Sequence, residues 1–129
     1  MWDAARYREY NDCCNAHRFG ALDAFVARDV RVNDEPQGLD AYVAGLEDVV
    51  RAFPDYRWTL RRLLVDGPWI SAQFRDTGTH RGTFLGVAAT GRPVDTVELA
   101  LYRIEDDRIA EVWVAADNQR VLEQLRRPA

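Results

Sequence analysis

Few side chains in this 129-residue sequence could move a proton near neutral pH. His80 is the first candidate, because an unperturbed imidazole has a pKa of about 6.5. It stands between a long predicted strand and a glycine-rich segment. His17, the only other histidine, lies near the end of a predicted helix, where a cation is favoured for structural reasons. We therefore take His80 as a candidate general acid or base.

Two acidic residues interrupt the apolar pattern of the second half. Asp76 shares the alternation of Phe74 and His80, so it faces the interior if Phe74 does. Glu98 points to the opposite side of its strand from Val97 and its other apolar neighbours. That side could contact solvent, a subunit interface or a cavity. A solvated face is the simplest interpretation for Glu98. Asp76 is the stronger candidate for contact with a ligand.

The elements that position these side chains follow from the spacing of the apolar residues. Apolar positions three and four apart predict helices over residues 2–17, 20–27 and 39–53. Alternation with period two predicts a short strand around Val30 and Val32, and long strands over 57–65, 69–80, 94–104 and 108–115. Residues 118–125 are predicted to form a closing helix. Helices followed by a strand meander indicate one α+β domain over residues 1–129, with an antiparallel sheet.

The stretch from Asp76 to Leu125 resembles the C-terminal half of the SnoaL-like polyketide cyclases. Three segments carry the resemblance: Gly78-Thr79-His80 with Phe84-Leu85-Gly86, then Ala89-Thr90-Gly91-Arg92, then Tyr102-Arg103-Ile104 leading to Ile109-Ala110-Glu111 and Trp113. The resemblance implies N-terminal helices packed on a strongly curved sheet, forming a cone with an internal pocket. It also implies a cofactor-independent cyclase or isomerase that acts on a small hydrophobic, polyketide-like intermediate of antibiotic biosynthesis.

The residue after Trp113 departs from the family pattern. In SnoaL-like cyclases an aspartate often follows this tryptophan and acts as the acid/base, whereas Val114 follows it here. Asp117 matches another frequent family aspartate, and its alternative role is the N-cap of the closing helix. We expect Val114 and Asp117 near the substrate, with proton transfer assigned to other residues.

The first part of the chain resembles ketosteroid isomerase, a relative on the same fold. In that family a first-helix tyrosine donates to an oxyanion, and a carboxylate after the first strand moves the proton. Tyr10 and Asp34 match these places in order and spacing (34 − 10 = 24 positions), and Asp95 lies near the place of a third, neutral acid. We expect His80, Asp34 and Tyr10 to line one cavity as catalytic residues. The expected substrate contacts are Trp58, Asp76, Tyr42, Phe84, Val114 and Asp117.

Composition and motifs limit the classes of partner. A net charge of −4 with dispersed arginines does not indicate nucleic-acid binding. No apolar run approaches the roughly 20 residues of a membrane span, and the charged start lacks a signal-peptide core, so we expect a cytoplasmic protein. Cys13 and Cys14 are adjacent, and no metal-ligand spacing or nucleotide fingerprint is present. We expect neither a metal nor an organic cofactor.

Two other functions stay open. An epoxide hydrolase resembling limonene epoxide hydrolase would need an aspartate–arginine–aspartate set, but Arg75 and Asp76 are neighbours and would face opposite sides of a strand. A non-catalytic small-molecule-binding accessory protein fits the loss of the aspartate after Trp113. In either case the outer sheet face carries Trp69, Trp113 and leucines without helical cover, so we expect a homodimer through that face.

Overall fold

The structure, a computed structural model, describes residues 1–127. Its helices are α1 (Ala4–Asn15), the 3₁₀ helix η1 (Phe19–Ala24), α2 (Leu39–Ala52) and α3 (Asn118–Leu125). Its strands are β1 (Val26–Val32), β2 (Glu35–Pro36), β3 (Arg57–Asp66), β4 (Trp69–Thr79), β5 (Pro93–Glu105) and β6 (Arg108–Ala116). The six strands form one sheet in the order β2-β1-β6-β5-β4-β3.

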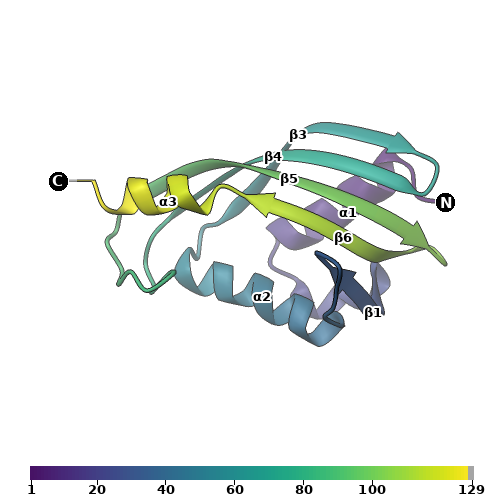
Figure 1. The fold of residues 1–129 in the computed structure, drawn as a ribbon, viewed down its shortest axis with the longest axis horizontal. Coiled ribbons are helices and arrows are strands. Elements are labelled where there is room, and N and C mark those ends of the chain that lie inside the picture. The colour runs from purple at the N-terminus through teal and green to yellow at the C-terminus, as the bar shows by residue number, and fades with distance from the viewer. Residues whose placement is uncertain (128–129) are drawn as a thin grey trace.

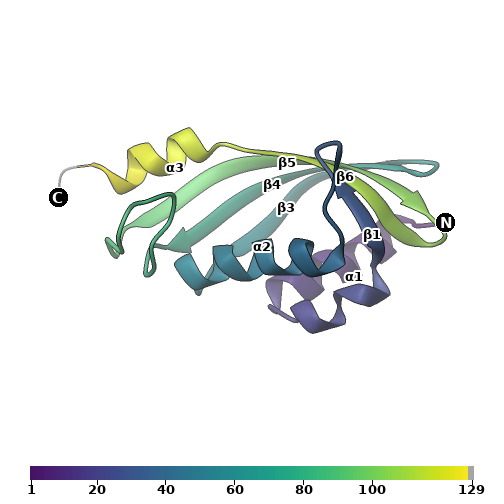
Figure 2. The same cartoon turned by 60° about the horizontal axis from the view of Figure 1, so that its bottom comes forward.

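The sheet is strongly curved, and α1 and α2 lie on its concave side (Figure 1). Figure 2 shows α3 extending beyond the end of β6, away from α1. The predicted α+β fold, with helices packed on a curved sheet, is therefore confirmed. No helix within residues 1–127 is long and apolar enough to cross a bilayer.

Two details of the predicted fold are wrong. The sheet is mixed, because β1 pairs parallel with β6 while β3 to β6 form an antiparallel meander. The spacing of apolar residues in a short strand does not indicate which other strand it pairs with. The parallel pairing therefore could not be predicted from the sequence. The predicted helix over 20–27 is a 3₁₀ helix that ends at Ala24, and β1 begins at Val26. Val26 and Val30 are both buried, four positions apart, which suits a strand as well as a helix.

The inner face of the sheet forms most of the core. Alternate residues of β4 and β5 point toward the helices and are buried, among them Ile70, Phe74 and Tyr102. Helix α1 covers this face with its buried side, which carries Tyr7, Tyr10, Asn11 and Cys14. A second, smaller apolar cluster contains Ala52, Phe53, Val94, Val121 and Leu125.

The loop between β4 and β5 is anchored on the end of α2. The backbone N–H groups of Arg81 and Gly82 both donate to the carbonyl oxygen of Ala52, which lacks a helical partner there. A Cβ atom on Gly82 would lie only 2.7 Å from the carbonyl oxygen of Arg51. Glycine at this position therefore permits the close approach that attaches the loop to α2.

Candidate functional site

An aromatic cavity of about 110 Å³ lies between α1, α2 and the concave face of the sheet. Each of the four long strands and both helices contribute to its wall. The lining residues are Tyr7, Tyr10, Asn11, Cys14, Tyr42, Leu46, Trp58, Phe74, Glu98, Tyr102, Val112 and Val114. The wall is thus mostly apolar with a few polar groups, as is usual for sites that bind small molecules.

Four tyrosine hydroxyls form two hydrogen-bonded pairs in this wall. The Tyr7 hydroxyl donates to that of Tyr102 at 2.9 Å, and the hydroxyls of Tyr10 and Tyr42 bond each other across α1 and α2. Burial raises the pKa of all four phenols above its ordinary value. At neutral pH these side chains are therefore neutral, and each keeps a proton that it can donate.

A pair of carboxyl groups lies on the inner face of β4 and β5. Phe74 is paired with Glu98 and Asp76 with Thr96, so Asp76 and Glu98 are diagonal neighbours on that face. The two carboxyl groups influence each other's ionisation, and burial is the main cause that raises the pKa of both. Asp76 is fully buried, whereas Glu98 lines the cavity. Asp76 Oδ1 has no hydrogen-bond partner within the described chain.

Glu98 holds a proton at neutral pH. Burial, followed by the neighbouring Asp76, raises the pKa of Glu98 to about 10. Burial also raises the pKa of Asp76, but hydrogen bonds from Glu98 and Tyr56 oppose that shift. Glu98 is therefore a carboxylic acid held neutral at the wall of an aromatic cavity, with the buried Asp76 carboxyl behind it. Such an acid can donate to a substrate oxygen that gains negative charge.

Four of the predicted residues lie on the cavity wall. They are Tyr10, Tyr42, Trp58 and Val114. The Trp58 backbone is held by Asn15 at the end of α1, whose side chain accepts from Trp58 N–H at 2.8 Å and donates to its carbonyl at 3.0 Å. A fifth predicted residue, Asp76, lies behind Glu98.

Asp34 lies outside the cavity, so the prediction that it faces Tyr10 across the cavity is wrong. It occupies the exposed turn between β1 and β2, where Asn33 and Asp34 have φ angles of 49° and 69°. This pair of positive φ angles is typical of a tight hairpin turn. The Asp34 carboxylate accepts a hydrogen bond from the Trp113 indole at 2.9 Å. Asp34 thus holds Trp113 on the outer face of the sheet.

His80 lies in the second apolar cluster and not on the cavity wall, so that part of the prediction is also wrong. Its ring is fully buried and packs against Phe53, with 5.4 Å between the ring centroids. The Thr90 backbone N–H donates to His80 Nδ1 at 3.2 Å, and His80 Nε2 has no partner within the described chain. Phe84, a predicted substrate contact, packs on Phe53 in the same cluster. His80 and Phe84 therefore attach the loop between β4 and β5 to Phe53 at the end of α2.

Asp117 and Arg75 also lie away from the cavity. The Asp117 side chain accepts from the Arg120 backbone N–H at 3.1 Å and caps α3, so its alternative role is confirmed, and it does not line the aromatic cavity. Arg75 points to the outer face, where it pairs with Asp95, while its neighbour Asp76 points inward. The guanidinium and the buried carboxylate are therefore on opposite sides of the sheet.

The interpretation of Glu98 as a solvated residue is wrong. Both faces of β5 carry apolar residues. Val97, Leu99 and Leu101 lie on the outer face, where 50%, 53% and 40% of their surface is accessible to solvent. The pattern alone therefore did not identify the inner face. The one available signal was parity with Tyr102, because Glu98 and Tyr102 are four positions apart on the same strand.

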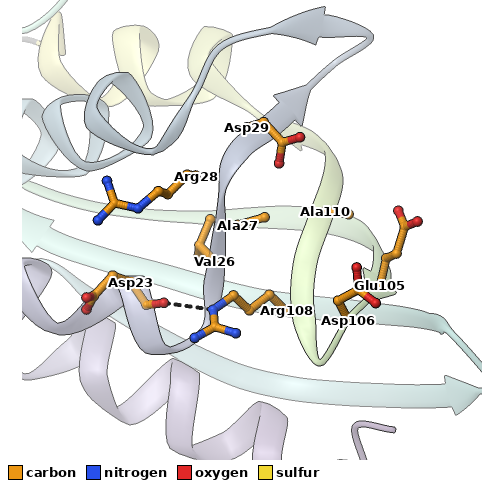
Figure 3. A pocket seen from close by; sticks show the side chains of 9 residues that line it. All are labelled: Asp23, Val26, Ala27, Arg28, Asp29, Glu105, Asp106, Arg108 and Ala110. Atoms are coloured by element: carbon orange, nitrogen blue, oxygen red, sulfur yellow. Dashed lines mark hydrogen bonds between the residues drawn. The ribbon is translucent and has the colours of Figure 1, made fainter.

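A larger groove of about 510 Å³ lies at the surface where β1 separates from β6 (Figure 3). Here the strand register moves from Val26–Ile109 to Arg31–Glu111, and Arg108 Nε donates to the carbonyl oxygen of Asp23 at 3.0 Å. The charged residues that line this groove are Asp23, Arg28, Asp29, Glu105, Asp106 and Arg108, all exposed. Because these charged groups are exposed to solvent, we assign the candidate site to the smaller aromatic cavity.

Metal binding finds no support in the described part of the chain. Within residues 1–127, no group of three or more His, Cys, Asp and Glu side chains is placed to hold a metal ion. Cys14 lines the cavity as a thiol whose pKa burial raises to about 12, so it is not a thiolate at neutral pH.

The fold and the cavity together define a cone-shaped α+β domain with an internal, mostly aromatic site. The chain belongs to the SnoaL-like polyketide cyclase family, whose sequence model matches residues 4–125. A search of curated proteins found no significant match.

Two solved structures illustrate the similarity. A SnoaL-like polyketide cyclase from Agrobacterium tumefaciens is 28% identical, with a TM-score of 0.86 over 97% of this chain and 99% of that one. TsrD from Streptomyces laurentii is 23% identical, with a TM-score of 0.88 over 98% of each chain, and supports the fold alone.

Proposed function

We propose that this protein catalyses acid/base ring closure or isomerisation of a small hydrophobic, polyketide-like intermediate in natural-product biosynthesis, without a cofactor. The observation that carries the proposal is the Asp76–Glu98 pair, which presents a neutral carboxylic acid to an aromatic cavity. Membership of the SnoaL-like polyketide cyclase family supports the same class of reaction. In this account Glu98 is the acid, and Asp76 is the anion that keeps it protonated.

The proposed ring closure leaves the protein with the protons it began with. An enol carbon of the substrate attacks a carbonyl carbon, and the carbonyl oxygen accepts the Glu98 proton as its charge develops. The enol oxygen becomes a carbonyl as the new carbon–carbon bond forms, and the proton it releases returns to the carboxyl pair. Glu98 is thus acid and then base within one turnover. Positioned acid/base groups contribute about 10²–10⁴-fold to a rate.

The phenols and Val114 support this assignment. Tyr10 and Tyr42 hold neutral hydroxyls on the same wall, so either can donate to an oxyanion. Ala100 is paired with Val114 and Glu98 with Ala116, so Glu98 is a diagonal neighbour of Val114. In family members with an aspartate at the Val114 position, a carboxyl would point into the same part of the cavity. Glu98 can therefore supply from β5 the acid that this chain lacks on β6.

The volume of the cavity restricts what can bind. At about 110 Å³ it is smaller than the roughly 300 Å³ at the lower end of ligand pockets. A single ring of the substrate fits the space as it stands, and a larger portion requires α2 to move outward. Ala52 is the only buried residue of α2, while Tyr42 and Leu46 are half-buried, so this helix has the weakest packing of the cavity walls.

The two alternatives are less well supported. A non-catalytic accessory protein needs no close pair of titratable groups at its cavity, whereas Asp76 and Glu98 form one. An epoxide hydrolase needs an arginine beside its carboxylates, but Arg75 lies on the outer face. We therefore favour the cyclase or isomerase.

We also propose that two copies of the chain pair through their outer sheet faces. Trp69, Val97, Leu99 and Leu101 are exposed on this face, and the Trp69 and Trp113 rings lie 6.1 Å apart between their centroids. The helices cover only the other face (Figure 2). Exposed apolar surface of this kind is commonly an interface. Charged side chains such as the Arg75–Asp95 ion pair border this apolar patch. In a symmetric dimer, Arg75 of one copy can also pair with an acidic residue of the other.

Binding of 4-nitrophenol tests the proposed site, because its phenolate resembles an enolate and its absorbance reports ionisation. Glu98→Leu should weaken phenolate binding by about 10–100-fold, since a hydrogen bond to a charged group is lost. Leu99→Ala is the matched control, because it changes the neighbouring residue on the outer face. Equal affinity in Glu98→Leu and the wild type would overturn the role of Glu98.

A further inference from the structure

Tyr56 connects the carboxyl pair to the segment between α2 and β3. Its hydroxyl donates to Asp76 Oδ2 at 2.9 Å, whereas Asp76 Oδ1 has no partner within the described chain. Its ring packs between Phe53 and Trp58, with centroid distances of 5.6 and 4.9 Å. Tyr56 does not line the cavity, and its hydroxyl acts on the site through Asp76.

The local structure holds the Tyr56 hydroxyl in this position. Asp55 accepts hydrogen bonds from the Thr79 backbone N–H at 2.6 Å and from the Thr79 hydroxyl at 2.7 Å, which joins the segment to the end of β4. A Cβ atom on Gly78 would lie 3.2 Å from Tyr56 Cδ1 and 3.1 Å from Phe53 Cβ. The absence of a side chain at Gly78 therefore lets the Tyr56 ring lie against β4.

The single proton of the carboxyl pair has two possible sites. On Glu98 it faces the cavity and can reach a substrate, whereas on Asp76 it is buried out of reach. A hydroxyl donated to Asp76 stabilises the ionised form of Asp76 and so favours the proton on Glu98. Burial raises the pKa of Tyr56 far above neutral, so its hydroxyl remains a donor.

We infer that Tyr56 is a positioning residue that keeps the shared proton on Glu98, the member of the pair that faces the cavity. This inference rests on the proposed function, since it explains how the acid is kept on the accessible residue. Loss of the Tyr56 hydroxyl removes a hydrogen bond to a charged group. That loss should move the proton about 10–100-fold toward Asp76.

Infrared spectroscopy with isotope-labelled protein locates the proton. In wild type at pH 7, the protonated-carboxyl band should shift when glutamate carries ¹³C and should not shift when aspartate does. In Tyr56→Phe, labelling of aspartate should shift a measurable part of the band. Asp55→Asn, which weakens the join to Thr79, should move the proton in the same direction with the Tyr56 hydroxyl still present.

Tyr7→Phe is the matched control, because it removes a buried hydroxyl that donates to Tyr102 instead. It should leave the proton on glutamate. A protonated glutamate that persists unchanged in a folded Tyr56→Phe protein would overturn the inference and leave the proposed function intact. A wild-type protein with no protonated carboxyl at pH 7 would instead overturn the proposed function itself.

Discussion

Replacing Glu98 with glutamine should change how the stability of the protein depends on pH. In the unfolded chain Glu98 releases its proton at its ordinary pKa of 4.5, whereas the folded protein holds it to a pKa of about 10. Between these values the folded state binds one proton more than the unfolded state. The free energy of unfolding therefore falls as pH rises, by at most about 1.4 kcal/mol per pH unit. Stabilisation from this group is complete below its ordinary pKa and is lost toward pH 10.

The assay is urea unfolding of wild type and Glu98→Gln at a series of pH values from 6 to 8. From pH 6 to 8 the wild type can lose at most about 2.7 kcal/mol of its free energy of unfolding through this group, and water that reaches the cavity reduces this loss. We therefore expect the free energy of unfolding of the variant to rise by about 1–2.7 kcal/mol relative to that of the wild type over this pH range. Glutamine does not titrate, and its amide can still donate to Asp76. Glu47→Gln, at an exposed glutamate of α2, is the control and should follow the wild type. Parallel curves for Glu98→Gln and wild type would refute the reasoning.

Three further predictions follow from the packing. Leu99→Glu places a charge at the centre of the outer face and should convert a dimer of 14.8 kDa chains to a monomer in sedimentation at micromolar concentration; a wild-type monomer contradicts the proposed dimer. Gly82→Ala forces a Cβ against the Arg51 carbonyl and should destabilise the fold by about 1–3 kcal/mol in urea unfolding; an unchanged midpoint speaks against this contact. Asn15→Ala leaves the Trp58 backbone N–H without its side-chain partner and the Trp58 C=O with only its Asn11 bond, and should cost about 1–3 kcal/mol by the same assay; an unchanged midpoint would show that water replaces the lost bonds.

The long elements could be predicted because each has one clear period. Helix α2 and strands β3 to β6 match the sequence pattern closely, since their apolar residues repeat at 3.6 or at 2 over many positions. The segment around Val26 failed because it is short, and its apolar spacing suits both a helix and a strand. The pairing of β1 with β6 depends on residues about eighty positions apart, which no local pattern reports.

The candidate site was only partly predictable for a similar reason. Tyr10 and Tyr42 could be singled out as polar residues on apolar helix faces, and both line the cavity. The Asp76–Glu98 pair depends on the register of β4 against β5, which brings two strand residues together from separate segments. Asp34 matched a family position in spacing, but its turn conformation directs the side chain to Trp113 on the outer face.

The ionisation state of Glu98 decides whether the cavity wall holds a neutral acid, and ¹³C NMR of glutamate-labelled protein follows it directly. The Glu98 carboxyl signal is assigned by its loss in Glu98→Gln. We expect this signal to keep its protonated position through neutral pH and to move only as the pH approaches about 10. A Glu98 signal that titrates fully near its ordinary pKa of 4.5 would contradict a neutral acid at the cavity wall.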